Sequence, residues 1–168
     1  MNTKLLKKVL ASTLALSMVL PIGVVNADKQ NTQQKAKSQQ TTRISGKDRI
    51  TTSVEISKSA YTTSENVVLA SGFNFADALS AGQLASALDA PLLLSSQNKL
   101  DSQTKNEIER LKAKKVFVVG GDNAISKTGI DTTLKSEKID VTRLEGQDRY
   151  FTSQKVVEKT KLTIIARI

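Results

Sequence analysis

The chain has 168 residues, contains neither cysteine nor histidine, and carries a formal net charge of +9 at pH 7. The two missing residue types exclude disulfides, zinc sites built from Cys or His, and catalysis by a Cys or His base. Lys and Arg are spread along the chain and aromatic residues make up only 4% of it, whereas nucleic-acid-binding surfaces gather basic residues with aromatics. We therefore expect no nucleic-acid partner and no bound metal.

The first 27 residues have the pattern of a secretory signal peptide. Lys4 and Lys8 precede an uncharged apolar stretch over residues 9–22, and small or modest side chains follow it. The apolar stretch is short for a membrane span and Pro21 interrupts it, so we expect cleavage and not a retained anchor. The mature chain is then expected outside the cell, without a stable membrane span.

Residues 28–41 are expected to form a flexible polar leader. They are mostly Gln, Lys, Asn, Thr and Ser. Such a stretch cannot bury enough apolar surface to offset the entropy lost on ordering. The folded part is therefore predicted to begin near residue 42.

From residue 42 onward, short β-type segments alternate with amphipathic helical patterns. We expect strands over residues 43–44, 66–71, 91–95 and 115–120, and helices over residues 49–60, 75–88, 102–112 and 126–134. Asp48 is suited to cap the first helix, and the apolar run over residues 67–70 within the expected strand 66–71 is typical of a strand covered on both faces. The alternation predicts right-handed βαβ crossovers. The expected fold is a Rossmann-like or flavodoxin-like three-layer α/β module with a mostly parallel sheet.

The opening of this module occurs twice in the chain. Residues 42–49 (TRISGKDR) return 100 positions later as residues 142–149 (TRLEGQDR), and the match extends into Thr152 and Ser153. A repeat of this length is a whole α/β unit. We therefore divide the chain into a first repeat over residues 42–138 and the start of a second over residues 139–168.

The second copy is expected to follow the first as far as its first helix, over residues 149–159, which is predicted to be shorter than the helix 49–60. Residues 162–166 (LTIIA) then stand where the strand 66–70 stands in the first copy, so a second strand is expected there. The remainder of a second sheet is missing from the sequence. This pattern suggests a truncated or frameshifted reading frame.

Four phrases in this sequence resemble the cell wall binding repeat 2 (CWB2) family, found in clostridial surface-layer and cell-wall proteins and in some Gram-positive autolysins. They occur, in order, at residues 43–52, 70–81, 90–94 and 118–126. The resemblance implies repeats that usually come in threes and pack with pseudo-threefold symmetry. It also implies non-covalent anchoring of a secreted protein to the cell wall or cell surface. The implied partners are an anionic cell-wall polysaccharide and neighbouring CWB2 modules, in cis or in trans.

Candidate ligand-binding residues follow from the predicted sheet. Ligands of parallel α/β sheets tend to lie at the carboxyl ends of the strands, where helix N-termini favour anions. The candidates are Arg43, Lys47, Arg49, Ser71, Gly72, Asn74, Gly120, Gly121 and Asn123. Each has a structural alternative, because glycines can serve turn geometry alone and Arg49 can pair with a carboxylate inside the fold.

No catalytic residue and no cofactor are expected. Asp77 is the one acid in an Ala-rich helix, and we expect it to bond backbone at a junction between modules. Residues 118–121 (VVGG) lack the third glycine of a dinucleotide-binding fingerprint. The sequence thus indicates a non-catalytic wall-binding module. Alternatives are the targeting part of a peptidoglycan hydrolase (an N-acetylmuramoyl-L-alanine amidase), of a surface protease or of an adhesin, and a nonfunctional truncated product.

Overall fold

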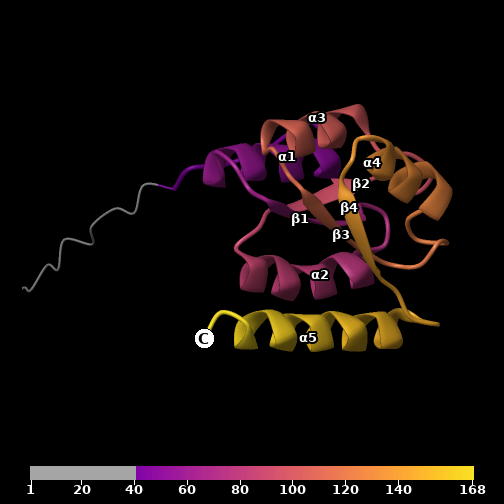
Figure 1. Cartoon of the computed structure of the whole chain (residues 1–168). Helices are drawn as coiled ribbons and strands as arrows, with labels where there is room; N and C mark the ends of the chain where they lie inside the picture. Colours follow the sequence, from indigo (N-terminus) through magenta and orange to yellow (C-terminus); the bar gives the residue numbers. More distant parts are fainter. Residues whose placement is uncertain (1–40) are drawn as a thin grey trace, which may run out of the picture. The chain divides into compact units, whose positions relative to one another are not determined.

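The computed structural model describes residues 41–168, so the predicted signal peptide and residues 28–40 of the leader lie outside the described residues. The described part has three layers, with helices on both faces of one sheet (Figure 1). The strands are β1 (Asn66–Ser71), β2 (Leu92–Ser95), β3 (Lys115–Val119) and β4 (Asp140–Leu144). The helices are α1 (Arg49–Ala60), α2 (Phe75–Leu88), α3 (Ser102–Arg110), the π-helical turn η1 (Lys127–Asp131), α4 (Thr132–Ser136) and α5 (Arg149–Ile165).

The sheet is parallel throughout and has the strand order β2-β1-β3-β4. This is the flavodoxin-like order, in which the chain reverses its direction across the sheet between β1 and β3. Helices α1, α3 and α4 cover one face, and α2 and α5 cover the other (Figure 1). The predicted fold class is confirmed.

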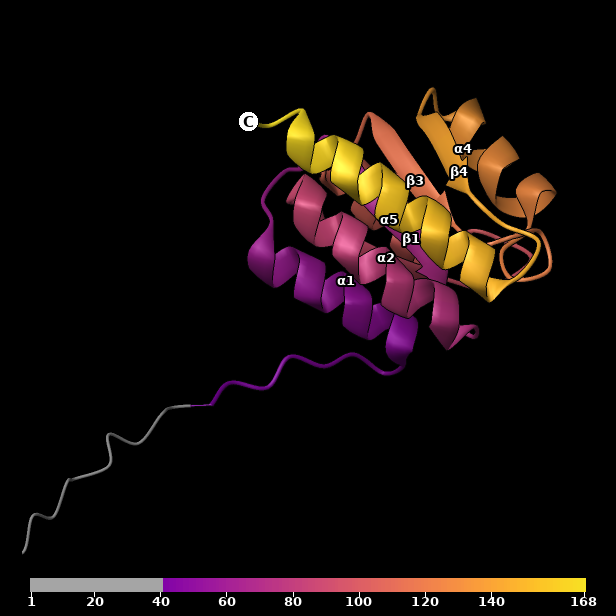
Figure 2. The same ribbon diagram turned by 90° about the horizontal axis from the view of Figure 1, so that it is seen from below.

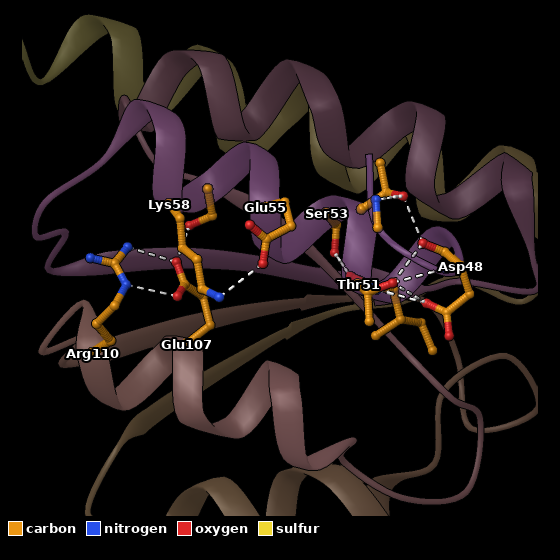
Figure 3. A network of polar contacts seen from close by, with 11 residues as sticks. Asp48, Thr51, Ser53, Glu55, Lys58, Glu107 and Arg110 are labelled. Carbon is orange, nitrogen blue, oxygen red and sulfur yellow. Dashed lines mark hydrogen bonds and ion pairs between the residues drawn. The ribbon is translucent and has the colours of Figure 1, made fainter. Parts of the chain in front are cut away.

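Helix α1 begins where the sequence predicts, because Asp48 forms a capping box with Thr51. The Asp48 carboxylate accepts a hydrogen bond from the Thr51 amide at 2.7 Å, and the Thr51 hydroxyl accepts one from the Asp48 amide at 2.9 Å (Figure 3). These bonds satisfy N–H groups that a helix start otherwise leaves open. The bonds that the carboxylate accepts from Thr51 also lower the pKa of Asp48. The predicted bounds of α1, β1 and α2 agree with the structure.

The core forms two clusters because successive residues of a strand point to opposite faces. Val67 and Leu69 of β1 pack under α1, α3 and α4, whereas Val68 and Ala70 pack under α2 and α5. All four side chains are fully buried. Full burial of a Val or Leu side chain contributes about 1.5–3 kcal/mol, so β1 is a main contributor to both clusters.

The predicted strand over residues 43–44 is wrong. This segment has no strand conformation, and Ile44 is 44% exposed. Its counterpart in the second copy, Leu144, ends β4, pairs with Val119 and is 9% exposed. The strand at this position of the second copy forms by pairing with β3 of the first copy. The β3 edge of the first copy is already occupied by β4.

The predicted strand over residues 162–166 is also wrong. Helix α5 continues through residues 162–165. It has 17 residues, compared with 12 in α1, so the prediction that the second-copy helix is the shorter one is also wrong. In the first copy the equivalent strand lies between two others, but nothing in the described part flanks residues 162–166 as a sheet. A helix satisfies its backbone groups internally, so the segment adopts it despite its β-branched residues. Leu162 and Ile165 stay largely exposed.

Four further boundaries differ from the sequence expectation, and one of them is the end of β3, which lies at Val119 and not at residue 120. Strand β2 begins after Pro91, which lacks an N–H group to donate, and α3 ends at Arg110. The helix expected over residues 126–134 is found as η1 followed by α4. Ser126 caps η1 as predicted, since its hydroxyl accepts a hydrogen bond from the Gly129 amide at 3.2 Å.

Candidate functional site

The candidate site lies along one edge of the sheet, where all four strands end and α1, α2 and α5 begin. We call this the carboxyl edge, and it comprises residues 48–49, 71–75, 95–98, 119–123 and 144–149. The chain leaves β1 toward one face and reaches β3 from the other face. Such a reversal opens a crevice outside the strand ends, which is the usual ligand position in open α/β sheets.

The structure brings four of the predicted residues together at the end of β1. The Arg49 guanidinium donates a hydrogen bond to the Gly72 carbonyl at 2.9 Å and lies 5.2 Å from the centre of the Phe73 ring. Ser71 is buried, and Asn74 is exposed two residues beyond Gly72. Arg49 therefore contacts a backbone carbonyl and an aromatic ring. The alternative expected from the sequence was a pair between Arg49 and a carboxylate inside the fold.

Helix α2 starts without a side-chain cap, unlike α1 and α5. Asn74 occupies the N-cap position, but its side chain makes no capping hydrogen bond within the described residues. The corresponding residues of α1 and α5, Asp48 and Asp148, both cap their helices. Open N–H groups at a helix start carry partial positive charge and favour an anion. The start of α2 thus places open N–H groups beside the Arg49 guanidinium, and Asp77 in the first turn of the same helix adds a buried carboxylate there.

Two exposed aromatic rings flank this point, and sequence reasoning did not single them out. Phe73 is 66% exposed and Phe75 is 71% exposed. Large apolar side chains gathered at the surface often mark a binding region. A phenylalanine pair directly after a buried strand was the available signal in the sequence.

Gly120 and Gly121 form a second group of candidate residues at the end of β3. Their contacts stabilise the turn after that strand. Gly120 has φ +122°, and a Cβ there would lie 2.9 Å from a carboxylate oxygen of Asp77. Its amide donates to the Leu144 carbonyl at 3.0 Å. The Gly121 carbonyl accepts hydrogen bonds from the amides of Ala124 and Ile125. These contacts support the turn role that the sequence left open for both glycines.

Asn123 lies with this second group, in the loop after β3. It is exposed, and its carbonyl accepts a hydrogen bond from the Gln97 side chain at 2.6 Å. The Gln97 carbonyl in turn accepts one from the Ser126 amide at 2.7 Å. The loops after β2 and β3 are therefore joined across the end of β1.

The two remaining candidates, Arg43 and Lys47, are exposed and lie before α1, apart from both groups. The second copy shows what the position of Arg43 can do. Arg143 donates to the carbonyls of Gly120 and Ile125 at 2.6 and 2.8 Å, and its side chain is only 9% exposed. An arginine at this position can therefore join two copies of the repeat.

Asp77 lies at the junction between the copies, as predicted. Its side chain faces Gly120 and is affected by the charge of Arg149 at the start of α5. Burial raises the pKa of Asp77, and Arg149 opposes that rise. The expected hydrogen bond from backbone is not seen among residues 41–168. Asp77 is 4% exposed.

A buried polar cluster joins α1 to α3 away from the carboxyl edge. The Ser57 hydroxyl donates to the Glu107 carboxylate at 2.6 Å. Arg110 donates to both carboxylate oxygens at 2.7 and 2.8 Å (Figure 3). Burial alone would raise the pKa of Glu107, but hydrogen bonds from Arg110 and Ser57 hold it below its usual value. Glu107 is 2% exposed, so this cluster stabilises the packing of two helices.

Residues 41–168 contain no group of three or more acidic, His or Cys side chains that could hold a metal ion. Within the same residues, no helix combines the length and the hydrophobicity that crossing a bilayer requires.

The sheet of this module is completed by β4, which opens the second copy of the repeat. Polar loops and open N–H groups lie at its carboxyl edge. These features are those of a binding module built from repeats. Residues 43–129 match the family described as Cell wall binding domain 2 (CWB2). The chain belongs to this family. Because the family is a binding domain and not a catalytic one, the match agrees with the prediction that this chain is not an enzyme.

Two relatives from Bacillus subtilis (strain 168) share the matched region. The chain is 37% identical to N-acetylmuramoyl-L-alanine amidase LytC over 116 residues, which covers 69% of this chain and 23% of the relative. It is 30% identical to the amidase enhancer over 119 residues, which covers 71% of this chain and 17% of the relative. The chain thus spans less than a quarter of the length of either relative.

Two solved structures from Clostridium difficile share the fold. Cwp6 is similar with a TM-score of 0.65 and 34% identity, covering 69% of this chain and 18% of that chain. Cwp8 is similar with a TM-score of 0.66 and 33% identity, covering 69% of this chain and 21% of that chain. The three-layer module is therefore shared with Cwp6 and Cwp8.

Proposed function

We propose that this chain is secreted and attaches non-covalently to a Gram-positive cell wall by binding an anionic secondary wall polymer. Membership of the CWB2 family supports wall binding as such. The carboxyl edge supports an anionic ligand. The cell surface is then the place where the chain acts.

The observation that carries the proposal is the placement of Arg49 beside the uncapped start of α2. Arg49 is held by the Gly72 carbonyl, and the first N–H groups of α2 follow Asn74. A phosphate or carboxylate of a wall polymer would meet a guanidinium and open backbone donors at one point. The exposed rings of Phe73 and Phe75 offer flat apolar surfaces to the adjoining sugars.

A second function is favoured by the relatives. LytC is an amidase, and the other Bacillus relative is an amidase enhancer, so this chain can be the targeting part of a peptidoglycan hydrolase. A surface protease or an adhesin would use the same anchor. Under this proposal the chain alone does not clear peptidoglycan in a zymogram, whereas fusion to an amidase increases the amount of amidase bound to walls.

The proposed anion site beside Arg49, at the start of α2, is tested by comparing two charge-removing variants in a pull-down with purified walls. Arg49→Gln should weaken binding about tenfold, the effect of losing a charged hydrogen bond worth about 1.5 kcal/mol. Lys135→Gln removes the same charge from the exposed surface of α4 and should leave binding unchanged. Binding should also weaken as salt rises. Equal binding by Arg49→Gln and Lys135→Gln would place the ligand elsewhere.

A further inference from the structure

An apolar groove lies between α1 and α2, along the outer edge of β2. The two helices cover opposite faces of the sheet, and α1 lies on the side of α2 that is away from α5 (Figures 1 and 2). Strand β2 pairs with β1 alone, so its other edge is free of strands. The groove has a volume of about 810 Å³, within the range of about 300–1,000 Å³ that is usual for small-molecule sites.

Large apolar side chains line this groove and are uncovered in the described part of the chain. Ile56 of α1 is 49% exposed, and Phe75 and Leu79 of α2 are 71% and 73% exposed. Apolar side chains that gather around one hollow mark a binding region, whereas scattered ones do not. Gly82 also lines the groove, and a Cβ added there would meet no atom within 4 Å. The groove is therefore open space that neighbouring side chains do not fill.

The backbone beside the groove is already bonded at Leu94, which disfavours an extended peptide as the occupant. The Leu94 amide donates to the Ser53 hydroxyl at 3.1 Å, and its carbonyl accepts from the Thr104 hydroxyl at 2.7 Å. Peptides that add to a sheet edge gain their affinity from such backbone groups. With both groups of Leu94 taken by side chains, the groove offers apolar contact in place of a continuous hydrogen-bond ladder.

One charge lies in the lining, at the end of the groove next to the carboxyl edge. Among the described residues that line the groove, Arg49 alone is charged. A guanidinium has five N–H donors, and within residues 41–168 that of Arg49 makes one hydrogen bond, to the Gly72 carbonyl. Donors thus remain for an anionic group. An apolar channel with a cation at one end is complementary to a ligand with an anionic head and an apolar chain.

The length of the groove sets the length of that chain. Its lining on α1 extends from Arg49 to Tyr61, which is about 18 Å along a helix. With C–C bonds of about 1.5 Å, an extended acyl chain of roughly 12 to 14 carbons has a similar length. One channel and one cation fit a ligand with a single chain and a single charge.

We propose that this groove binds a long-chain fatty acid. Its carboxylate bonds the Arg49 guanidinium, and its acyl chain lies against Ile56 and Leu79 and extends toward Tyr61. This ligand is additional to the wall polymer of the proposed function. Arg49 would serve either ligand, whereas the apolar lining between α1 and α2 serves the fatty acid.

The proposal is tested by calorimetric titration of this chain with octanoate, decanoate and dodecanoate, each below the concentration at which it forms micelles. One molecule should bind per chain, and the affinity should rise roughly twofold to fourfold for each added CH₂ group. Arg49→Gln should weaken the binding of decanoate about tenfold, through loss of a charged hydrogen bond. The same variant should bind neutral decanol as the native chain does.

Three variants test whether the groove is the place of binding. Ile56→Glu puts a carboxylate into the lining, and Gly82→Leu fills the open space without adding charge, so both should abolish binding. The matched control is Ile165→Glu, since Ile165 is 68% exposed on α5 and lies outside the lining. It should bind decanoate as the native chain does. Gly82→Leu keeps the test decisive even where Ile56→Glu disturbs folding.

Absence of binding would overturn the proposal, and so would an affinity that does not depend on chain length. Equal binding by Gly82→Leu and the native chain would also overturn it, as would equal losses for Ile56→Glu and Ile165→Glu. Self-association in sedimentation that Ile56→Glu abolishes, without binding of the acids, would assign the groove to a second copy of the chain. These measurements contain no wall, so their failure is distinguishable from a failure to bind the polymer.

Discussion

Arg143 of the second copy forms a bidentate ion pair with Asp131 of the first. Its Nη2 lies 2.5 Å from Oδ1, and its Nε lies 3.0 Å from Oδ2. The two side chains are 9% and 14% exposed. Because the same guanidinium also bonds two carbonyls of the loop after β3, one arginine fixes the register of β4 on the sheet.

Replacing Arg143 should lower the free energy of unfolding. Arg143→Gln leaves Asp131 without its cation in a nearly buried position, and we expect the free energy of unfolding to fall by about 3 kcal/mol. Arg143→Lys restores the charge without the fork and should recover part of the loss. Urea unfolding measures both. The control is Lys127→Gln, which breaks a more exposed pair with Glu145 and should cost less than about 1 kcal/mol. Equal losses for the two positions would contradict a special role of Arg143.

Glu107 should make the stability depend on pH. Its pKa is depressed in the folded state, so its contribution is fully present above the ordinary value of 4.5 and is lost as pH falls below it. At pH 7, Glu107→Gln should lower the free energy of unfolding by about 2 kcal/mol. The gap between native chain and variant should close as pH falls below 4.5. A gap that stays constant down to about pH 3 would show that the carboxylate is not held ionised.

Two glycines should respond to alanine in opposite directions. Gly120 has φ +122° and its Cβ would crowd Asp77, so Gly120→Ala should destabilise by about 1–3 kcal/mol. Gly82 lies inside α2 with open space around its Cα, so Gly82→Ala should stabilise by about 0.5–1 kcal/mol. Thermal unfolding of both variants, with the native chain as reference, measures the two shifts. A stabilised Gly120→Ala would contradict the left-handed backbone at that position.

The two copies of one helix position should tolerate charge differently. Val156→Glu places a carboxylate between α5 and α2 and should cost about 3 kcal/mol or more. Ile56→Glu, at the equivalent position of α1, should change stability by less than about 0.5 kcal/mol, because this side chain is already half exposed. Chemical denaturation of the two variants tests the asymmetry. Similar costs at both positions would mean that the Ile56 face is covered.

Most of the fold could be predicted because its signals are local. The apolar run over residues 67–70, with Asn66 and Ser71 at its ends, and the Asp48 cap predicted the bounds of β1 and α1 correctly. The two failures, at residues 43–44 and 162–166, share a cause. A segment with β-type residues becomes a strand only where a sheet edge is available, and edge availability depends on the packing of repeats and not on the segment itself.

The site could be predicted only in part. The expected parallel sheet and the helix starts that follow its strands placed Arg49, Gly72 and Asn74 in one candidate site, and the structure brings them together at the end of β1. The structural role of Gly120 depends on its close approach to Asp77, which lies far away in the sequence and which no local pattern reveals. The difference between Arg43 and Arg143 is equally non-local, since identical residues become exposed or buried by the neighbour they meet.

The most direct measurement is a binding isotherm of this chain on purified Gram-positive walls, before and after extraction of the anionic secondary polymer. We expect saturable binding to intact walls and its loss on extracted walls, with recovery when the purified polymer is coated back onto them. Equal binding to both wall preparations would contradict the anionic polymer as the ligand.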